Sequence, residues 1–388
     1  MRVFLRSRPA VLLLVFALFL LSVPAALAGR LTRYSADVYM NGKLHPDPRL
    51  RVSESGEIHV PLVAVCRALG LPAPEERDGV WRWMDSPLPE GVGQISAAAL
   101  YVPLTYLESM GLHAGASVFG SAATVCIDNI RPIQDQEWTR ELTDCAHATG
   151  ATAEGKTYTN SKEAFEYNYL FGFTAFEVDL HMTSDGHVAA LHNWNQFRSQ
   201  CAMGGSGRAD LAEFLAARIY DRYTPLDFEG IAQLMQEHPD VLFILDTKRD
   251  EPQAMYQEIL RIAEEVNPEI LDRLVPYAYD EESLDLLLAA HPWKRYIYTL
   301  YSPQKGQKAW DMLLSGYRRG VRVFSNWSSQ LDDRTLSFCQ AAGLTLYTFV
   351  VNDRDEYEYL SQTGAVAGIM SDFLTPYSSA GGADTDAP

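Results

Sequence analysis

The chain has 388 residues, of which 47% are hydrophobic and 21% are charged, and its formal net charge is -18. Such an acidic chain argues against nucleic acid as a partner, because binding a phosphate backbone needs a basic surface. The length favours two domains, and only the last stretch, SSAGGADTDAP, has the composition of a disordered tail, which we place at residues 377–388.

The first 28 residues have the pattern of a secretory signal peptide. Arg2, Arg6 and Arg8 form a basic start, AVLLLVFALFLLSV is an apolar run, and ALA ending at Ala28 is a small-residue cleavage pattern. A retained membrane anchor is the alternative, although the run is shorter than the about 20 residues that a spanning helix needs. We therefore expect a secreted or cell-envelope protein.

The cysteines are scattered and odd in number: Cys66, Cys126, Cys145, Cys201 and Cys339. No CxxC or Cys/His spacing indicates a zinc module. A disulfide between Cys66 and Cys126 and a set of buried free thiols both stay open.

Residues 36–128 contain short apolar runs that are interrupted by Gly, Pro and Asp. DVYMNGKL carries the Asn-Gly signal of a tight hairpin. IHVPLVAVCRALGL predicts the end of a strand followed by a short helix, and LYVPLTYLESMGLHAG repeats this order. The copies at 60–70 and 102–111 therefore predict a small duplicated α+β unit.

This pattern resembles the copper amine oxidase N-terminal-like domain, or stalk domain, and the resemblance covers residues 31–130. It implies a spacer or surface-attachment module, with contact to a cell-wall component as a further option. No copper site is expected, because His45, His59 and His113 are far apart and lack ligand spacing.

A polar linker, RPIQDQEWTREL, precedes a region of alternating strands and helices. Strands are expected near 143–147, 174–180, 188–192, 241–246, 273–277, 295–300, 321–325, 345–350 and 366–370. Helices are expected over 161–171, 252–266, 281–289, 306–318, 332–342 and 354–362. This alternation favours an α/β fold with a (β/α)8 TIM barrel over residues 141–376, preceded by the small α+β domain. An open doubly wound sheet is the alternative, but the sequence has no Gly-rich turn of the dinucleotide-binding type.

The motif FEVDLHM places two carboxylates on one strand. Glu177 and Asp179 are two residues apart, so both side chains leave the same face, about 7 Å apart along the strand. Neighbouring carboxylates repel each other, and a hard divalent cation with oxygen ligands is the usual way to keep both ionised. The alternative is a polar strand face that meets solvent.

Three further strand ends carry residues with similar chemistry. DCAHATG places His147 after the first strand, HVAALHNW places His192 after another, and VLFILDTK ends with Asp246 and Lys248 on one face. In a barrel these ends meet at one rim, where catalytic groups collect. Four such ends together favour a site over packing.

This set resembles the glycerophosphodiester phosphodiesterase family, within the wider phosphatidylinositol phospholipase C-like barrels. The resemblance implies that His147 and His192 are the catalytic pair, that Glu177, Asp179 and Asp246 are metal ligands, and that the ion is a divalent cation, Mg²⁺ or Ca²⁺.

The sequence departs from the family pattern at several positions. Ala148 stands where the family has an Arg, YTNS at 158–161 replaces PENT, and Asn193 replaces the Asp of HD. The third ligand is Asp246 rather than Glu, which is closer to the sphingomyelinase D branch.

We therefore expect a phosphoric diester hydrolase that cleaves glycerophosphodiesters into an alcohol and glycerol 3-phosphate. The cation acts as a Lewis acid on a nonbridging oxygen, and the two histidines share the proton transfers. In our hypothesis His147 deprotonates the neighbouring hydroxyl and His192 protonates the leaving alcohol, although the roles are interchangeable. Lys248 offsets charge near the phosphate.

Other residues near the strand ends are weaker candidates. Asn352 is expected to contact substrate, and His181 is a less favoured zinc ligand. Aromatic residues that would form an apolar wall, or pack in the core, are Trp194, Tyr298, Tyr301 and Trp327.

Two other functions are compatible with the sequence. One is a phospholipase of C or D type that acts on intact phospholipid. The other is a surface-binding protein whose barrel has lost activity, which the missing Arg and the altered PENT motivate.

Overall fold

The computed structural model describes residues 31–46, 49–248, 250–301 and 309–374. The predicted signal peptide at 1–28 and the predicted tail at 377–388 lie outside these residues. The described chain forms two compact units, one of residues 31–35 and 49–109 and one of residues 36–46 and 110–374. None of the described helices combines the length and the apolar character needed to cross a bilayer.

The first unit is built around a duplicated strand and helix. β5 (Ile58–Pro61) leads into α1 (Leu62–Leu69), and β10 (Ala99–Pro103) leads into α2 (Leu104–Ser109). The repeated VPL motifs predict this duplication, and the structure adds that the two strands pair antiparallel with Val60 opposite Val102. The remaining strands of this unit are β1 (Thr32–Arg33), β4 (Arg51–Val52), β6 (Glu75–Arg77), β7 (Val80–Trp83), β8 (Ser86–Pro87) and β9 (Gln94–Ser96). The stalk-domain resemblance and the surface role of this unit stay predictions.

The second unit contains a small sheet beside its barrel. The strands are in the order β11 (His113–Phe119), β12 (Ala122–Asp128), β2 (Asp37–Met40) and β3 (Lys43–His45). β2 and β3 form the hairpin that the Asn-Gly pair predicts. This grouping differs from the predicted boundary at residue 130, because four strands before that boundary group with the barrel.

Contacts with α10 (Asp333–Ala341) explain this grouping. His113 Nε2 lies 2.8 Å from the carbonyl oxygen of Ala341, and the Ser117 hydroxyl donates to Gln340 Oε1 at 2.6 Å. Gly115 lies so close to α10 that a Cβ there would be 2.1 Å from the Ala341 carbonyl oxygen. The small sheet therefore covers an outer helix of the barrel.

The described cysteines are all free thiols. Cys66 belongs to the first unit and Cys126 to the second, so the structure has no disulfide between them. Both side chains are buried in the cores of their own units.

The barrel closes as the alternation of strands and helices predicts. Eight parallel strands form the ring, and β13 pairs with both β21 and β14 to close it, with Ala146 opposite Ser371 and Phe176. The ring strands are β13 (Cys145–Ala146), β14 (Ala175–Met182), β16 (Leu242–Asp246), β17 (Leu274–Ala278), β18 (Ile297–Thr299), β19 (Val323–Trp327), β20 (Thr345–Phe349) and β21 (Gly368–Ser371).

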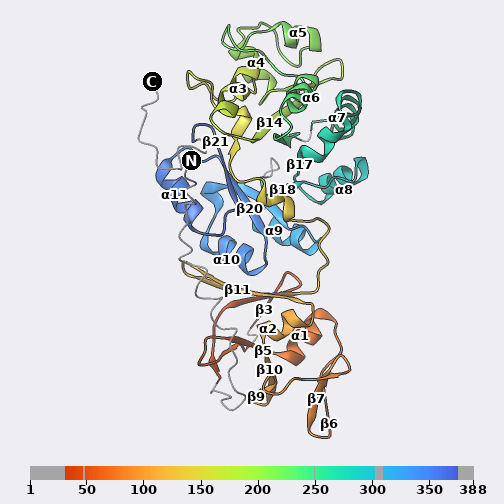
Figure 1. The fold of residues 1–388 in the computed structure, drawn as a ribbon, viewed down its shortest axis with the longest axis vertical. Helices are drawn as coiled ribbons and strands as arrows, with labels where there is room; N and C mark the ends of the chain where they lie inside the picture. Colours follow the sequence, from red (N-terminus) through yellow and green to blue (C-terminus); the bar gives the residue numbers. More distant parts are fainter. Residues whose placement is uncertain (1–30, 47–48, 249, 302–308, 375–388) are drawn as a thin grey trace, which may run out of the picture. The chain divides into compact units, whose positions relative to one another are not determined.

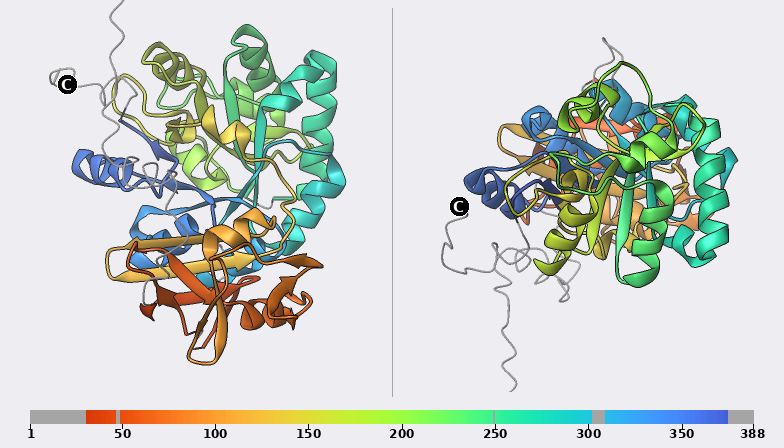
Figure 2. Two further views of the ribbon diagram at one scale, coloured as in Figure 1. Left: turned by 60° about the horizontal axis from the view of Figure 1, so that its bottom comes forward. Right: turned by 90° about the horizontal axis from the view of Figure 1, so that it is seen from above.

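Helices surround the ring (Figures 1 and 2). Besides α10 they are α3 (Lys162–Leu170), α4 (Trp194–Gln200), α5 (Leu211–Ala216), α6 (Phe228–Glu237), α7 (Pro252–Val266), α8 (Glu281–Ala290), α9 (Ala309–Arg318) and α11 (Arg354–Gln362). The sequence pattern did not predict α4, α5 and α6. α4 and α5 pack in a small separate core around Trp194, Phe197 and Phe214, so Trp194 is a packing residue. The buried residues of α6 belong to the main core.

The expected strand at 188–192 is not part of the ring. It is β15 (Val188–Ala190), which pairs antiparallel with β14 and places Ala190 opposite Leu180. The hairpin brings residue 191 back beside Asp179, whose carbonyl oxygen accepts a 2.9 Å hydrogen bond from the Leu191 amide. His192 therefore reaches the site by a hairpin and not by a parallel crossover.

The alternation of β14 separates its two faces. Phe176 and Val178 belong to the core between the ring and its helices, while Ala175 belongs to the core inside the ring. Because side chains alternate along a strand, Glu177 and Asp179 share the inner face with Ala175. The strand thus directs both carboxylates into the barrel.

Candidate active site

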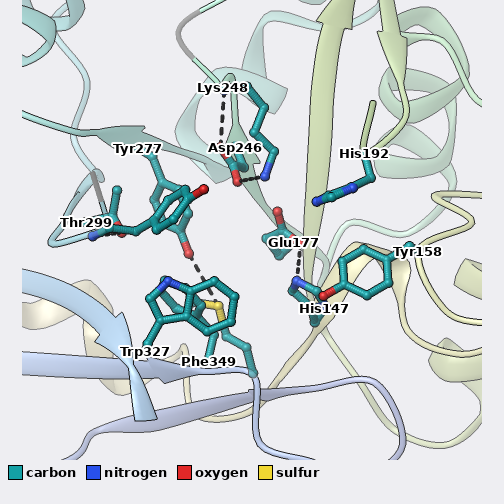
Figure 3. Close-up of a pocket in the computed structure, with 12 residues that line it drawn as sticks. His147, Tyr158, Glu177, His192, Asp246, Lys248, Tyr277, Thr299, Trp327 and Phe349 are labelled. Carbon is teal, nitrogen blue, oxygen red and sulfur yellow. Dashed lines mark hydrogen bonds and ion pairs between the residues drawn. The ribbon is translucent and has the colours of Figure 1, made fainter. Parts of the chain in front are cut away.

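An open hollow lies at the carboxyl ends of the ring strands (Figure 3), with about 500 Å³ of empty space when the part open to solvent is included. One side carries acid–base and charged groups and the other carries apolar rings. The lining residues include His147, Tyr158, Glu177, His192, Asp246, Lys248, Tyr277, Thr299, Tyr301, Trp327, Phe349 and Met370.

Three carboxylates meet in this hollow. Glu177, Asp179 and Asp246 each offer an oxygen, and these oxygens lie within 4.8 Å of one another. The register of the sheet explains the meeting, because β14 and β16 pair in parallel with Asp179 directly opposite Asp246. All three residues are buried. The carboxylates predicted as ligands therefore form one cluster.

Lys248 is the ammonium group of this cluster. Its Nζ lies 2.7 Å from Asp179 Oδ1 and also donates to Asp246 Oδ2. Burial disfavours its charge, but the carboxylates of Asp246 and Asp179 outweigh burial and raise the pKa of Lys248 above its usual range. The other oxygen of Asp246 accepts a hydrogen bond from the Tyr279 hydroxyl. Lys248 is thus a fixed positive charge beside the carboxylates.

A single ammonium does not balance three buried carboxylates. Burial and the neighbouring charge of Asp179 raise the pKa of Glu177 to about 8. Burial also acts to raise the pKa of Asp179, but Lys248 overcomes it and lowers that pKa to about 2. The cluster therefore has room for more positive charge, and its oxygen-only ligands suit a hard divalent cation. These residues fit the expected metal.

His147 lies directly after β13, and a hydrogen bond to one ring nitrogen fixes its imidazole ring. Its Nδ1 is 2.8 Å from Asp372 Oδ1, and its Nε2 is 3.9 Å from Glu177 Oε2. Burial disfavours the charged ring, but the hydrogen bond to Asp372 and the charge of Glu177 raise the pKa of His147 to about 9. This contact leaves Nε2 facing the carboxylate cluster.

Asp372 was not among the residues that the sequence pattern suggested. It follows β21 directly, so the signal available was an acidic residue at the end of the last strand. Asn352 donates from Nδ2 to Asp372 Oδ2 at 2.8 Å, and its Oδ1 accepts from the Asp372 amide at 2.9 Å. The structure thus places Asn352 behind Asp372, and its contact with substrate stays a prediction.

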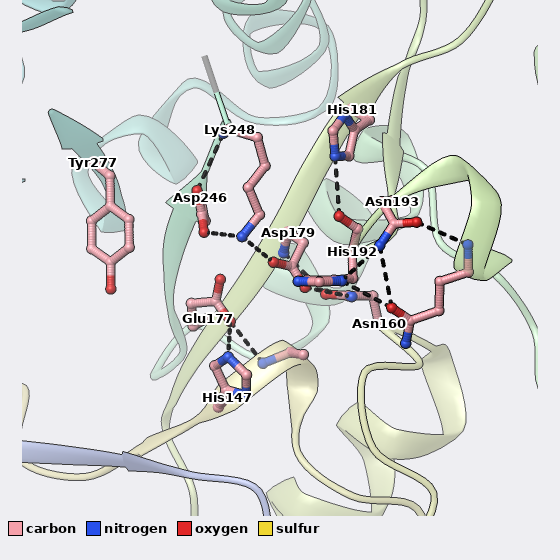
Figure 4. Close-up of polar contacts among 12 residues, drawn as sticks. His147, Asn160, Glu177, Asp179, His181, His192, Asn193, Asp246, Lys248 and Tyr277 are labelled. Atoms are coloured by element: carbon pink, nitrogen blue, oxygen red, sulfur yellow. Dashed lines mark hydrogen bonds and ion pairs between the residues drawn. The ribbon is translucent and has the colours of Figure 1, made fainter. Parts of the chain in front are cut away.

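His192 lies beside Asp179, on the same side of the hollow as His147 (Figures 3 and 4). Its Nδ1 is 2.9 Å from Gln196 Oε1 and 3.0 Å from Asn193 Nδ2. Asn193, the residue that replaces the family's Asp, caps α4 by accepting a hydrogen bond from the Gln196 amide at 2.9 Å. The start of α4 therefore orients the His192 ring.

His181 does not join the acidic cluster. Its Nδ1 lies 3.2 Å from Asp250 Oδ2, and its Nε2 lies 3.1 Å from the carbonyl oxygen of His192. Among the described residues, the carboxylates of the cluster come only from β14 and β16. His181 supports the backbone of His192 and takes no part as a ligand in this cluster.

The YTNS segment that replaces PENT takes part in the site. The Tyr158 ring lies 4.9 Å from the His147 ring and 4.8 Å from the His192 ring, measured between centroids. Burial and the charge of Asp372 raise the pKa of Tyr158 to about 12. Asn160 donates to Asp179 Oδ2 and accepts from the Asp179 amide, both at 3.0 Å.

The backbone of this segment is strained at two positions. Tyr158 and Asn160 have φ angles of 55° and 47°, in the left-handed region that is costly for residues other than Gly. Sequence reasoning treated the segment as a departure from the family, whereas the structure makes it a support of the site.

Two of the four aromatic candidates line the hollow. Tyr301 and Trp327 lie on its rim, whereas Tyr298 is buried in the core between the ring and its helices. Tyr277 and Phe349 complete the aromatic side.

No family model matches the sequence, and no curated protein is similar to it. Solved structures are similar in fold. A protein from Galdieria sulphuraria assigned as a glycerophosphodiester phosphodiesterase matches with a TM-score of 0.51 and 17% identity, over 60% of this chain and 94% of that chain.

Two further structures match at a TM-score of 0.49. One, from Silicibacter pomeroyi DSS-3, is assigned as a glycerophosphoryl diester phosphodiesterase and is 18% identical, over 60% of this chain and 90% of that chain. The other, the Oleispira antarctica phosphodiesterase in complex with its product sn-glycerol-3-phosphate, is 16% identical, over 60% of this chain and 93% of that chain. At 17% identity and a TM-score of 0.51, the match to the Galdieria sulphuraria structure shows a likeness of fold alone.

Proposed function

We propose that the barrel is a metal-dependent phosphodiester hydrolase that cleaves glycerophosphodiesters into an alcohol and glycerol 3-phosphate. One observation carries the proposal: two histidines and a buried cluster of three carboxylates meet at the carboxyl end of a TIM barrel. Histidines beside such a cluster are placed for general acid–base catalysis on a group that the cluster holds.

Glu177, Asp179 and Asp246 would hold a divalent cation, Mg²⁺ or Ca²⁺. When bound, this cation supplies Lewis-acid polarisation of a nonbridging phosphate oxygen. Lys248 keeps its charge next to the cluster and attracts the anionic diester.

The two histidines carry the protons. The neutral form of His147, which becomes the major form above about pH 9, takes the proton of the substrate hydroxyl next to the phosphate, and that oxygen forms a bond to phosphorus. The bond from phosphorus to the leaving oxygen breaks, and His192 gives that oxygen a proton. Water then opens the cyclic phosphate with the roles reversed. The contact between His147 and Asp372 supports a fixed ring with Nε2 toward the cluster.

The test is product analysis of the purified protein with glycerophosphocholine in Mg²⁺, in Ca²⁺ and in EDTA. We expect release of choline and glycerol 3-phosphate that needs a divalent cation and that falls by about 10² to 10⁴ in His147→Ala. Release that is unaffected by EDTA, or by His147→Ala and His192→Ala, would contradict the proposal. Turnover of intact phospholipid alone would favour a phospholipase, and metal binding without turnover of either class would favour an inactive binding protein.

A further inference from the structure

The side of the hollow away from the histidines is made of aromatic rings from neighbouring strands. Tyr277 comes from β17, Tyr301 follows β18, Trp327 ends β19 and Phe349 ends β20. Figure 3 shows Tyr277 and Trp327 on one side of Glu177, with His192 on the other. Four adjacent strands thus contribute one ring each.

The rings meet at steep angles. Tyr301 and Trp327 have centroids 5.8 Å apart with planes at 77°, and Trp327 and Phe349 have centroids 5.0 Å apart with planes at 57°. Rings at steep angles to one another present faces and edges in several directions around a ligand, whereas parallel stacked rings would present one face. Tyr301 and Trp327 are only half-buried, so their remaining surface is available at the hollow.

The polar side-chain groups on this side are the hydroxyls of Tyr277, Thr299 and Tyr301 and the indole N–H of Trp327, and none of them is charged. The Thr299 hydroxyl oxygen accepts from the Tyr301 amide at 3.3 Å, and the Tyr277 hydroxyl lies 3.4 Å from Met370 Sδ. A glycerol or inositol group would bring several hydroxyls that need partners, and a primary ammonium would bring three donors. The aromatic side suits a group that needs no hydrogen bonds.

The charges of the site restrict the ligand further. Among the described residues that line the hollow, Lys248 is the only Lys or Arg, and its ammonium is engaged by Asp179 and Asp246. A second phosphate on the substrate would therefore meet no free Lys or Arg among these residues. A positively charged group, by contrast, is attracted by aromatic faces, most strongly by that of Trp.

We propose that Tyr277, Tyr301, Trp327 and Phe349 form a subsite for a quaternary ammonium group, so that the preferred substrates are phosphodiesters of choline. A trimethylammonium group carries positive charge, fills apolar space and forms no conventional hydrogen bonds. This inference rests on the proposed phosphodiesterase function for its substrate, but the subsite itself is testable by binding.

The kinetic test compares kcat/KM for glycerophosphocholine with that for its uncharged carbon isostere, the 3,3-dimethylbutyl ester of glycerol phosphate. Glycerophosphoethanolamine and glycerophosphoglycerol complete the series. The two main substrates share shape and differ in charge, so their ratio reports the attraction of the rings for a cation. We expect about a tenfold preference for the choline ester, equivalent to about 1.4 kcal/mol.

Variants assign the preference to the rings. Trp327→Leu should abolish it, and Trp327→Phe should keep part of it, because Phe retains an aromatic face. Tyr301→Leu is the second variant in case Trp327→Leu does not fold. Tyr359→Leu on α11 is the control, because Tyr359 is 59% exposed and does not line the hollow.

Binding measurements test the subsite independently of the proposed catalytic function. Calorimetry with phosphocholine and with 3,3-dimethylbutyl phosphate, in Mg²⁺, requires no turnover. Tighter binding of phosphocholine without hydrolysis of any diester would support the subsite and overturn the proposed function. Metal-dependent hydrolysis with equal kcat/KM for the choline ester and its isostere would overturn the subsite alone. Equal binding of the two probes, or a choline preference that survives in Trp327→Leu and in Tyr301→Leu, would also overturn it.

Discussion

His147 depends on a residue far along the chain. Its Nδ1 contact is with Asp372, which is 225 positions away in the sequence and is itself held by Asn352. A carboxylate at Nδ1 selects the orientation of the imidazole and stabilises its charged form. Asp372 is therefore a positioning residue for His147.

We predict that Asp372→Asn lowers kcat by about 10²-fold while the protein stays folded. Loss of the negative charge lowers the pKa of His147, which Asp372 helps to raise to about 9. The limb of the pH–rate profile that belongs to His147 should therefore move to lower pH. Kinetics from pH 5 to 10, with Asp355→Asn at an exposed position as the control, would check this. An unchanged pH profile would reject the positioning role.

Glu177 couples cation binding to pH. Burial and the charge of Asp179 raise its pKa to about 8, so below that pH most Glu177 side chains hold a proton that a cation must displace. Well above pH 8 few Glu177 side chains hold a proton that has to leave. We therefore predict that Mg²⁺ affinity rises with pH up to about 8, by up to about tenfold per unit for one displaced proton.

Calorimetric titrations with Mg²⁺ at pH 6, 7, 8 and 9, in buffers of different ionisation enthalpy, would measure both the affinity and the protons released. We expect proton release near pH 7 and little above pH 9. A dissociation constant that is constant from pH 6 to 9 would show that Glu177 is not the group displaced.

At the scale of elements, β14 serves two purposes at once. Its inner face carries Glu177 and Asp179, and its outer face carries Phe176 and Val178 into the main core. Phe176 packs against Phe165 and Phe243 with centroids 4.5 and 5.7 Å apart. A tightly packed outer face fixes the strand that presents the carboxylates.

We predict that Phe176→Ala lowers the free energy of unfolding by about 3 to 5 kcal/mol, because the ring is fully buried and its removal leaves a cavity. Phe171→Ala should cost less than about 1 kcal/mol, since Phe171 is 40% exposed. Urea denaturation of both variants measures the difference. Equal denaturation midpoints for the two variants would contradict this account of the core.

At the scale of the whole molecule, the strands at 36–46 and 110–128 belong to the barrel unit. Asp128, at the end of β12, accepts a hydrogen bond from the Tyr317 hydroxyl, and its Oδ1 lies 3.7 Å from Arg322 Nη2. Asp128 and Arg322 are buried, so removing one would leave the other without its partner. The barrel thus needs its preceding strands.

We predict that a chain starting at residue 131 is poorly soluble or melts at a clearly lower temperature than the full chain. The matched variant starts at residue 36 and replaces 47–109 by a Gly/Ser linker, which removes the first unit and keeps the small sheet. It should retain a melting temperature close to that of the full chain. Thermal unfolding measures the melting temperatures of the two variants and of the full chain. A chain from residue 131 that is as stable as the full chain would contradict the role of the small sheet.

The local sequence pattern was sufficient to predict most strands and helices of the barrel. Alternation and turn residues located the nine strands beyond residue 140 and six of the helices, and the two-residue spacing in FEVD and LDTK predicted which side chains share a face. These features depend on neighbours a few residues apart, which a sequence displays directly. The short helices α4 and α5 were not predicted. Their small core joins residues from separate segments, so it leaves no periodic pattern in either helix.

Sequence alone determined the class of fold and the acid, histidine and lysine residues that meet at the barrel mouth. Tertiary structure decided which residues support them: Asp372 behind His147, Tyr158 between the histidines, and the early strands against α10. The physical reason is that periodicity is a local property of the chain. Closure of the ring and the contacts of its loops depend on residues hundreds of positions apart, whose pairing leaves no local pattern.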